Sequence, residues 1–244
     1  MSLELLRQKI RAIEWHEHSL SKVLSFGAQS IDEALPYGGL QSGCVHEWTG
    51  PYRGPLTAIC ASILGRSTKQ NGPILWCSTL IDVYPSGLVS YGLSCEHIVF
   101  AKPDSLKEVL WAAEEGLNTP QLSAVIAEVG TVSTVAYRRL QLAAQKSGVT
   151  LFLLIDSKSA AAAAKVPLSN CVSRWVIEPM PSDNAPGLWR DNGVGAPRFT
   201  VTLSRCRGAA TPQKWNLEWN ATTLSFNLLA NYSLAEEPKA AIAM

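Results

Sequence analysis

The chain has 244 residues, of which 47% are hydrophobic and 17% charged, so it can bury the core of one large domain and is not a disordered polypeptide. Its 21 Lys and Arg residues against 20 Asp and Glu residues give a formal net charge of +1, which leaves nucleic-acid binding open but is not the strongly basic balance of a dedicated duplex binder. Six cysteines without a C-x-x-C pair are typical of reduced thiols in a cytoplasmic protein, and we expect neither a signal peptide nor a membrane-spanning segment.

The first segment predicts an amphipathic helix. Leu3, Leu6, Ile10 and Ile13 recur at helical spacing, with charged residues between them. We therefore expect an N-terminal helix within residues 1–20. Its apolar stripe would pack either on its own domain or on a partner protein.

The middle of the chain alternates apolar runs with amphipathic stretches. Apolar runs bounded by turn residues predict strands, and helical periodicity between them predicts helices. This order describes an α/β fold with a mostly parallel central sheet and helices on both faces. We expect strands near 45–48, 74–77, 98–100, 124–129, 149–155 and 172–178, and helices from about 56, 85, 105 and 133.

The pattern changes near the C-terminus. Apolar residues alternate with polar ones around Val201 and again around Leu217, which predicts half-buried strands. We expect them to form an antiparallel hairpin extension at the sheet edge. The α/β domain is thus expected over residues 21–232, with a flexible tail over residues 233–244.

The segment 31–57 has the layout of a nucleotide-binding unit, with turn glycines, a strand, a loop and a helix. A phosphate-binding loop reads Gly-x-x-x-x-Gly-Lys-Ser/Thr, and its lysine holds the phosphates. Here the loop from Gly50 to Gly54 is one residue short, and Pro55 stands near the position of the lysine. Pro51 and Pro55 also remove two backbone N–H donors. The sequence therefore predicts a nucleotide-binding scaffold without its nucleotide chemistry.

The order of elements resembles the RecA-type recombinases and ATPases over roughly residues 31–226. Within that group the chain is similar to the ImuA family. This resemblance implies a cytoplasmic accessory protein, nucleoid-associated when DNA is damaged, in SOS-induced error-prone translesion synthesis. It implies as partners an ImuB-like relative of Y-family polymerases and a DnaE-type polymerase, with RecA as a further candidate. The residues that carry the resemblance are Ile31-Asp32, Gly38-Gly39-Leu40, Gly43, Glu47, Gly50-Pro51, Tyr84-Pro85 and Gly92.

Compared with active members of that group, the nucleotide site is degenerate. Arg53 is the only cation in the loop, and Thr57 corresponds to the Mg²⁺-binding hydroxyl. Glu128 stands where a Walker-B Asp is expected. The group has a catalytic Glu near positions 78–80, but here the first carboxylate in that region is Asp82. We expect no catalytic residue and no cofactor, and hence a pseudo-ATPase. Two alternatives stay open: a divergent ATP-binding ATPase, and a division inhibitor that resembles SulA.

No metal site is expected either. His46 and Glu47 are neighbours on one predicted strand, so their side chains point to opposite faces of the sheet. No Cys or His spacing indicates a zinc site.

Candidate contacts with single-stranded DNA come from two regions. Cationic grooves with stacking aromatic residues bind single strands, and Trp189 and Trp215 lie among basic residues near the C-terminus. A second region, the loop after the strand 149–155, is comparable with a segment that contacts DNA in RecA relatives. The alternative for both is an ordinary solvated edge. The candidate contacts are Lys158, Lys165, Arg190, Arg205, Arg207 and Lys214.

Overall fold

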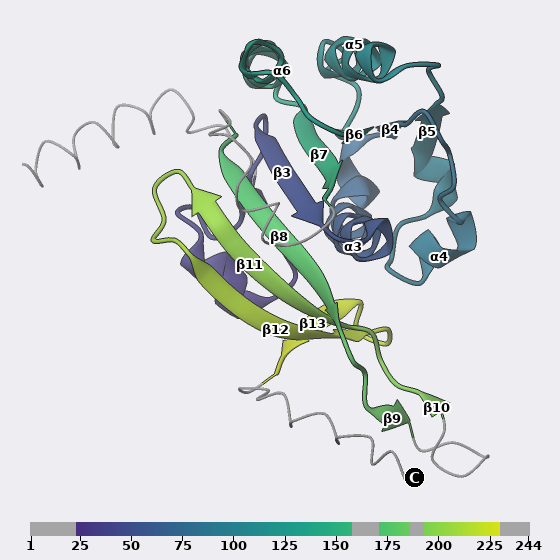
Figure 1. Ribbon diagram of the computed structural model, residues 1–244, viewed down its shortest axis with the longest axis vertical. Helices are drawn as coiled ribbons and strands as arrows, with labels where there is room; N and C mark the ends of the chain where they lie inside the picture. The colour runs from purple at the N-terminus through teal and green to yellow at the C-terminus, as the bar shows by residue number, and fades with distance from the viewer. Residues whose placement is uncertain (1–22, 158–170, 186–192, 230–244) are drawn as a thin grey trace, which may run out of the picture.

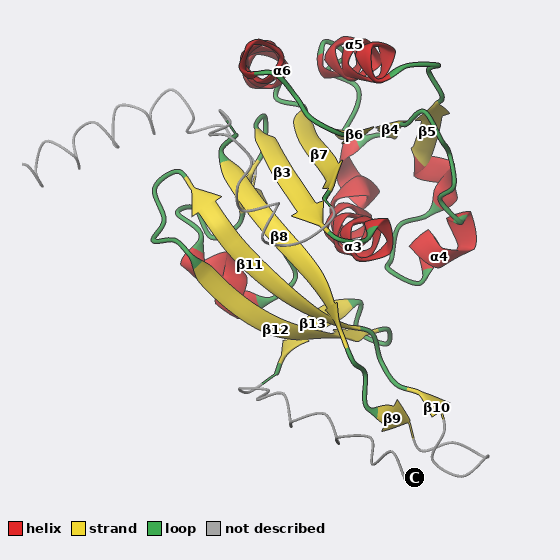
Figure 2. Cartoon of the chain, viewed as in Figure 1, coloured by secondary structure: helices red, strands yellow, loops and turns green. Residues whose placement is uncertain are grey.

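The computed structural model describes residues 23–157, 171–185 and 193–229 (Figure 1). The helix expected within residues 1–20 and the tail expected over residues 233–244 lie outside the described residues. The described chain forms one large mixed sheet with helices on both faces, as Figure 2 shows by element type.

The main sheet of the described residues has nine strands, and all six strands expected from the apolar runs are part of it. From one edge to the other the nine strands are β13 (Ser225–Leu228), β12 (Gln213–Asn220), β11 (Arg198–Cys206), β8 (Ser173–Met180), β3 (Val45–Gly50), β7 (Thr150–Asp156), β6 (Ala124–Val129), β4 (Ile74–Cys77) and β5 (Ile98–Ala101). The six strands from β8 to β5 are parallel. Beyond β8 each successive strand pairs antiparallel with the one before it: β11 with β8, β12 with β11, and β13 with β12. The mostly parallel sheet and its antiparallel C-terminal extension are therefore confirmed.

Two hydrophobic clusters lie on opposite faces of the sheet. Neighbouring residues of one strand reach different clusters, for example Val125 and Ile126 in β6, because strand side chains alternate between faces. Figure 1 shows α5 and α6 together over one face and α3 and α4 over the other. The helices are α2 (Gln29–Ala34), α3 (Arg53–Asn71), α4 (Pro85–Val89), η1 (Cys95–His97), α5 (Leu106–Leu117) and α6 (Thr134–Ser147).

Two short antiparallel pairs complete the described structure. β1 (Val23–Leu24) pairs with β2 (Leu40–Gln41), and β9 (Asn184–Ala185) pairs with β10 (Gly193–Val194). The second pair extends beyond the end of β8 and the start of β11 (Figure 1).

Helix α3 begins three residues earlier than the apolar periodicity predicts. Tyr52 has extended backbone angles (φ −141°, ψ 139°), and helical geometry starts at Arg53 rather than at Leu56. Pro55 is the third residue of the helix, where its missing N–H costs nothing because the first-turn donors have no partner within the helix. The loop after β3 is therefore only Pro51 and Tyr52.

The adjacent residues His46 and Glu47 do point to opposite faces. The buried His46 contacts Ser173 Oγ through Nδ1 at 2.7 Å and the Gln41 carbonyl oxygen through Nε2 at 2.8 Å. On the other face Glu47 is fully buried, with Arg174 Nε 2.6 Å from its Oε1 and the Tyr137 hydroxyl donating to its Oε2. Burial and Glu47 together raise the pKa of Tyr137 far above its usual value.

Candidate nucleotide-like site

The candidate site lies at the carboxyl ends of β3, β4 and β6. In open parallel sheets this edge is where ligands bind. β3 ends at Gly50 and leads into α3, and Glu128 is the fifth of the six residues of β6. The structure therefore brings together the two positions that the sequence assigned to the degenerate phosphate loop and the degenerate Walker-B element.

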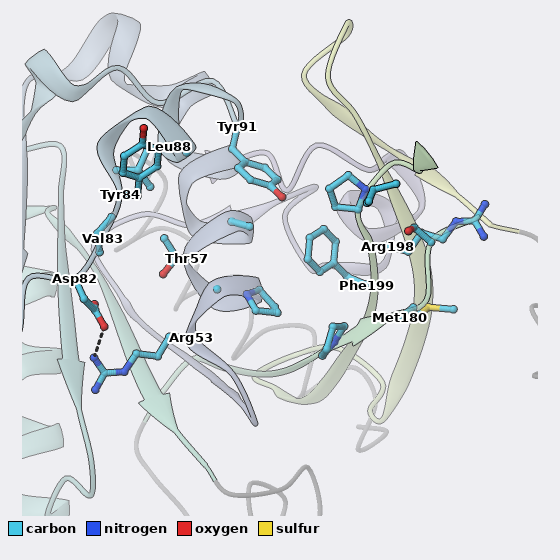
Figure 3. A pocket seen from close by; sticks show the side chains of 18 of the residues that line it. Arg53, Thr57, Asp82, Val83, Tyr84, Leu88, Tyr91, Met180, Arg198 and Phe199 are labelled. Carbon is cyan, nitrogen blue, oxygen red and sulfur yellow. Dashed lines mark ion pairs between the residues drawn. The ribbon is translucent and has the colours of Figure 1, made fainter. Parts of the chain in front are cut away.

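Glu128 is only 6% exposed, and both of its carboxylate oxygens are bonded to the protein. Arg53 Nη1 and Ser78 Oγ each donate to Oε2 at 3.0 Å, and Trp76 Nε1 donates to Oε1 at 2.8 Å. Arg53 Nη1 also lies 3.9 Å from Asp82 Oδ2, on the exposed side of the site (Figure 3). The Arg53 guanidinium is thus paired with carboxylates of the same chain.

The backbone of the loop is not shaped as a phosphate cradle. Such a cradle directs consecutive N–H groups inward by alternating right-handed and left-handed residues. No residue from Gly50 to Gly54 has a left-handed φ. A Cβ on Gly50 would lie 2.2 Å from the Ile177 carbonyl oxygen of β8, whereas a Cβ on Gly54 would meet nothing within 4 Å. Gly50 is therefore required for the close approach of β8.

A cavity of about 580 Å³ opens beside this loop. Thr57, one turn after Arg53 on α3, lines it, so the hydroxyl that corresponds to a Mg²⁺ ligand is accessible. Figure 3 shows Tyr84 and Tyr91 on the α4 side and Phe199 of β11 on the opposite side. The walls of a nucleotide site are present, but most of their surface is apolar.

The charge around the cavity is unfavourable for a triphosphate. Arg198, the second cation among the described lining residues, points away from the cavity in Figure 3. It bonds to Asp183, and its Nε donates to Glu218 Oε2 at 2.7 Å. The hydrogen bond from Arg198 lowers the pKa of Asp183. Asp183 and Glu218 are not among the described lining residues. Around Arg53 the cavity therefore has two carboxylates, Asp82 and Glu128, which leaves this end with an excess of one negative charge.

The described residues contain no group of three or more His, Cys, Asp or Glu side chains that could hold a metal ion. The sequence matched two residues of this cavity, Thr57 and Glu128, to positions that hold Mg²⁺ in active relatives. Glu128 is already committed to Arg53, Ser78 and Trp76. Within the described part of the chain, no helix is both long and apolar enough to cross a bilayer.

The candidate DNA contacts fall in different places. Arg205, Arg207 and Lys214 lie at the hairpin between β11 and β12. Because β11 runs antiparallel to β8, this hairpin is at the amino ends of the parallel strands, opposite to the cavity. Arg207 and Lys214 are exposed, and Arg205 is half-buried. Lys158, Lys165 and Arg190 lie outside the described residues. DNA contact stays a prediction.

Sequence reasoning missed three partners of the site. Trp76 and Ser78 hold Glu128, and Arg198 is bonded to two carboxylates. The first two could have been found from strand order, because β4 and β6 are neighbours and pair Cys77 with Ala127. The partners of Arg198 depend on how β8 and β11 end, for which the sequence carries no comparable signal.

The fold is that of the RecA-like proteins. The crystal structure of the RadB recombinase superposes with a TM-score of 0.59 over 81% of this chain and 96% of that chain, at 16% sequence identity. RecA of Bdellovibrio bacteriovorus is 24% identical over 111 residues, which are 44% of this chain and 28% of that protein. No family model matches the chain.

The relationship is closer to one branch of this class. Protein ImuA of Caulobacter vibrioides strain NA1000 is 34% identical over 206 residues, which cover 80% of this chain and 83% of that protein. The ImuA of a second strain of the species gives the same values. The chain belongs to the ImuA family, and it is accordingly a RecA-like accessory protein of mutagenesis.

Proposed function

We propose that this protein is a non-catalytic adaptor in error-prone translesion DNA synthesis. Its partners are an ImuB-like relative of Y-family polymerases and a DnaE-type polymerase, with RecA as a further candidate. Family membership supports the pathway. The proposal that the protein is not an ATPase is supported by the pairing of Arg53 with Glu128, at the position where a phosphate would be held.

Hydrolysis of ATP by this fold needs a cation on the phosphates and a carboxylate free for Mg²⁺ or for the attacking water. Arg53 and Glu128 neutralise each other, and Ser78 occupies the region in which the related ATPases carry a catalytic carboxylate. The contacts of Glu128 with Arg53, Ser78 and Trp76 link β6 to the start of α3 and to the end of β4. The protein thus keeps a rigid RecA-like surface and gives up turnover.

Co-purification tests the adaptor role directly. The tagged full chain is mixed with the ImuB-like protein and the DnaE-type polymerase of the same organism, singly and together. We expect at least the ImuB-like protein to be retained, and ATP hydrolysis to stay at the level of the buffer. Retention of neither protein would overturn the adaptor proposal. Strong ATP hydrolysis would overturn its non-catalytic part.

A further inference from the structure

The cavity beside α3 is bordered by exposed apolar side chains. Tyr84 is 73% exposed and Val194 is 92% exposed, and both line the cavity. Two further exposed apolar residues are near lining residues in the sequence: Tyr52, next to Arg53, is 62% exposed, and Leu80, two residues before Asp82, is 54% exposed. Exposed apolar side chains gathered around a cavity are typical of a site that another molecule covers.

The shape favours an extended segment over a small enclosed ligand. Small-molecule sites bury about 70–90% of their ligand, whereas two apolar side chains that line this cavity, Tyr84 and Val194, are mostly exposed to solvent. They also belong to separate elements, one before α4 and one in β10. A chain that lies across the cavity would contact both at once.

Charge selects the kind of segment. At the α3 end of the cavity Arg53 faces two lining carboxylates, Asp82 and Glu128, so this end is net negative and disfavours an anionic ligand. Asp82 is 52% exposed and shares Arg53 with the buried Glu128, at the longer distance of 3.9 Å. A Lys or Arg of an incoming segment would therefore find an accessible carboxylate at the edge of the cavity.

We propose that this cavity is a docking groove for an extended peptide segment of a partner protein, with apolar side chains in the cavity and a Lys or Arg beside Asp82. The groove lies where related ATPases bind their nucleotide. Because the residues that bind phosphate are missing here, an apolar and mildly acidic surface is available for a peptide. This assignment rests on the adaptor role proposed above and specifies its binding surface.

Selection from a phage-displayed library of random peptides tests the groove without knowledge of the partner. Purified full-length protein is the target, and a Tyr84→Ala/Val194→Ala variant is used for counter-selection. Both side chains are largely exposed, so the variant should fold normally. The matched control is Trp111→Ala/Val135→Ala, which removes side chains that are 62% and 72% exposed on α5 and α6, over the opposite face.

We expect enriched peptides to carry apolar residues and a Lys or Arg. They should bind the wild type and the control variant equally, and the groove variant about tenfold more weakly, as for loss of an aromatic anchor. Asp82→Lys should weaken their binding, and added salt should reduce the difference. Three results would overturn the groove: no peptide that distinguishes wild type from groove variant, enrichment of acidic peptides, or displacement of the peptides by Mg-ATP.

The groove and the adaptor role can fail separately. If the ImuB-like protein binds equally well to the wild type and to the Tyr84→Ala/Val194→Ala variant, the adaptor role stands and the groove is not its binding surface. If groove-dependent peptides are found while neither polymerase protein binds, the groove stands and the proposed partners are wrong.

Discussion

Arg53 Nη1 lies 3.0 Å from Glu128 Oε2, so the first residue of α3 pairs with a carboxylate of its own chain where RecA-like ATPases bind a phosphate. Glu128 is 6% exposed, and Arg53 is 43% exposed. The pair is therefore partly shielded from solvent, and it links β6 to the start of α3. The following predictions test this pair and the packing around it.

The pair should contribute to stability in a way that a double-mutant cycle can measure. Arg53→Ala leaves the buried Glu128 without its cation, and we expect a loss of about 1–2 kcal/mol. This is less than the roughly 3–5 kcal/mol typical of fully buried pairs, because Arg53 is partly solvated. In a Glu128→Gln background the same substitution should cost about 1 kcal/mol less. Urea unfolding supplies the four free energies, and equal costs in both backgrounds would contradict the pairing.

Gly50 and Gly54 should respond in opposite ways to alanine. Gly50→Ala places a Cβ 2.2 Å from the Ile177 carbonyl oxygen, so we expect a loss of about 3 kcal/mol or failure to fold. Gly54→Ala meets no atom within 4 Å and lies in the first turn of α3, so it should be neutral or stabilising by up to about 1 kcal/mol. The thermal unfolding temperatures of both variants, compared with that of the wild type, test this difference. A damaging Gly54→Ala would indicate that the loop still needs a glycine there.

The stability of the protein should fall as the pH drops below 6.5. Burial lowers the pKa of His46 from its usual 6.5 to about 4, because the charged ring is disfavoured away from water, and the hydrogen bond to the Gln41 carbonyl offsets only part of this effect. Between these values the unfolded chain binds the proton and the folded protein does not. The free energy of unfolding should therefore lose about 3 kcal/mol between pH 6.5 and pH 4 through this residue and level off below. His46→Gln should flatten this part of the pH profile measured by urea unfolding, and an unchanged slope would exclude His46 as its source.

The buried Glu47 should depend more on its cation than on its hydroxyl partner. Arg174→Met removes the cation from a fully buried carboxylate and should cost about 3–5 kcal/mol. Tyr137→Phe removes one hydrogen bond and keeps the ring, so it should cost about 1–3 kcal/mol. Chemical unfolding compares the two, and a larger cost for Tyr137→Phe would contradict this order.

The sequence predicts most of this fold because its strands and helices differ in periodicity. The buried runs of β6 and β7 read as parallel strands, and the alternation around Val201 reads as the antiparallel extension. The start of α3 could not be read this way, since Arg53, Gly54 and Pro55 carry no apolar period. In the structure they form the first turn of α3, directly after the two-residue connection from β3.

The candidate site was only partly predictable. The missing lysine and the position of Glu128 are visible in the sequence. The contact between Arg53 and Glu128 was not predictable, because it depends on α3 and β6 being neighbours in space. The two residues are 75 positions apart in the sequence. The separation of Arg198 from Arg205 and Arg207 at opposite ends of β11 likewise appears only once strand direction is known.

Titration of the full-length protein with Mg-ATP, followed by calorimetry, tests the central claim most directly. We predict no binding at millimolar nucleotide for the wild type, because the cation of the loop is held by Glu128 and Asp82, and these three side chains together leave one negative charge where the phosphates would lie. Micromolar binding of Mg-ATP that is lost in Arg53→Ala would contradict the account.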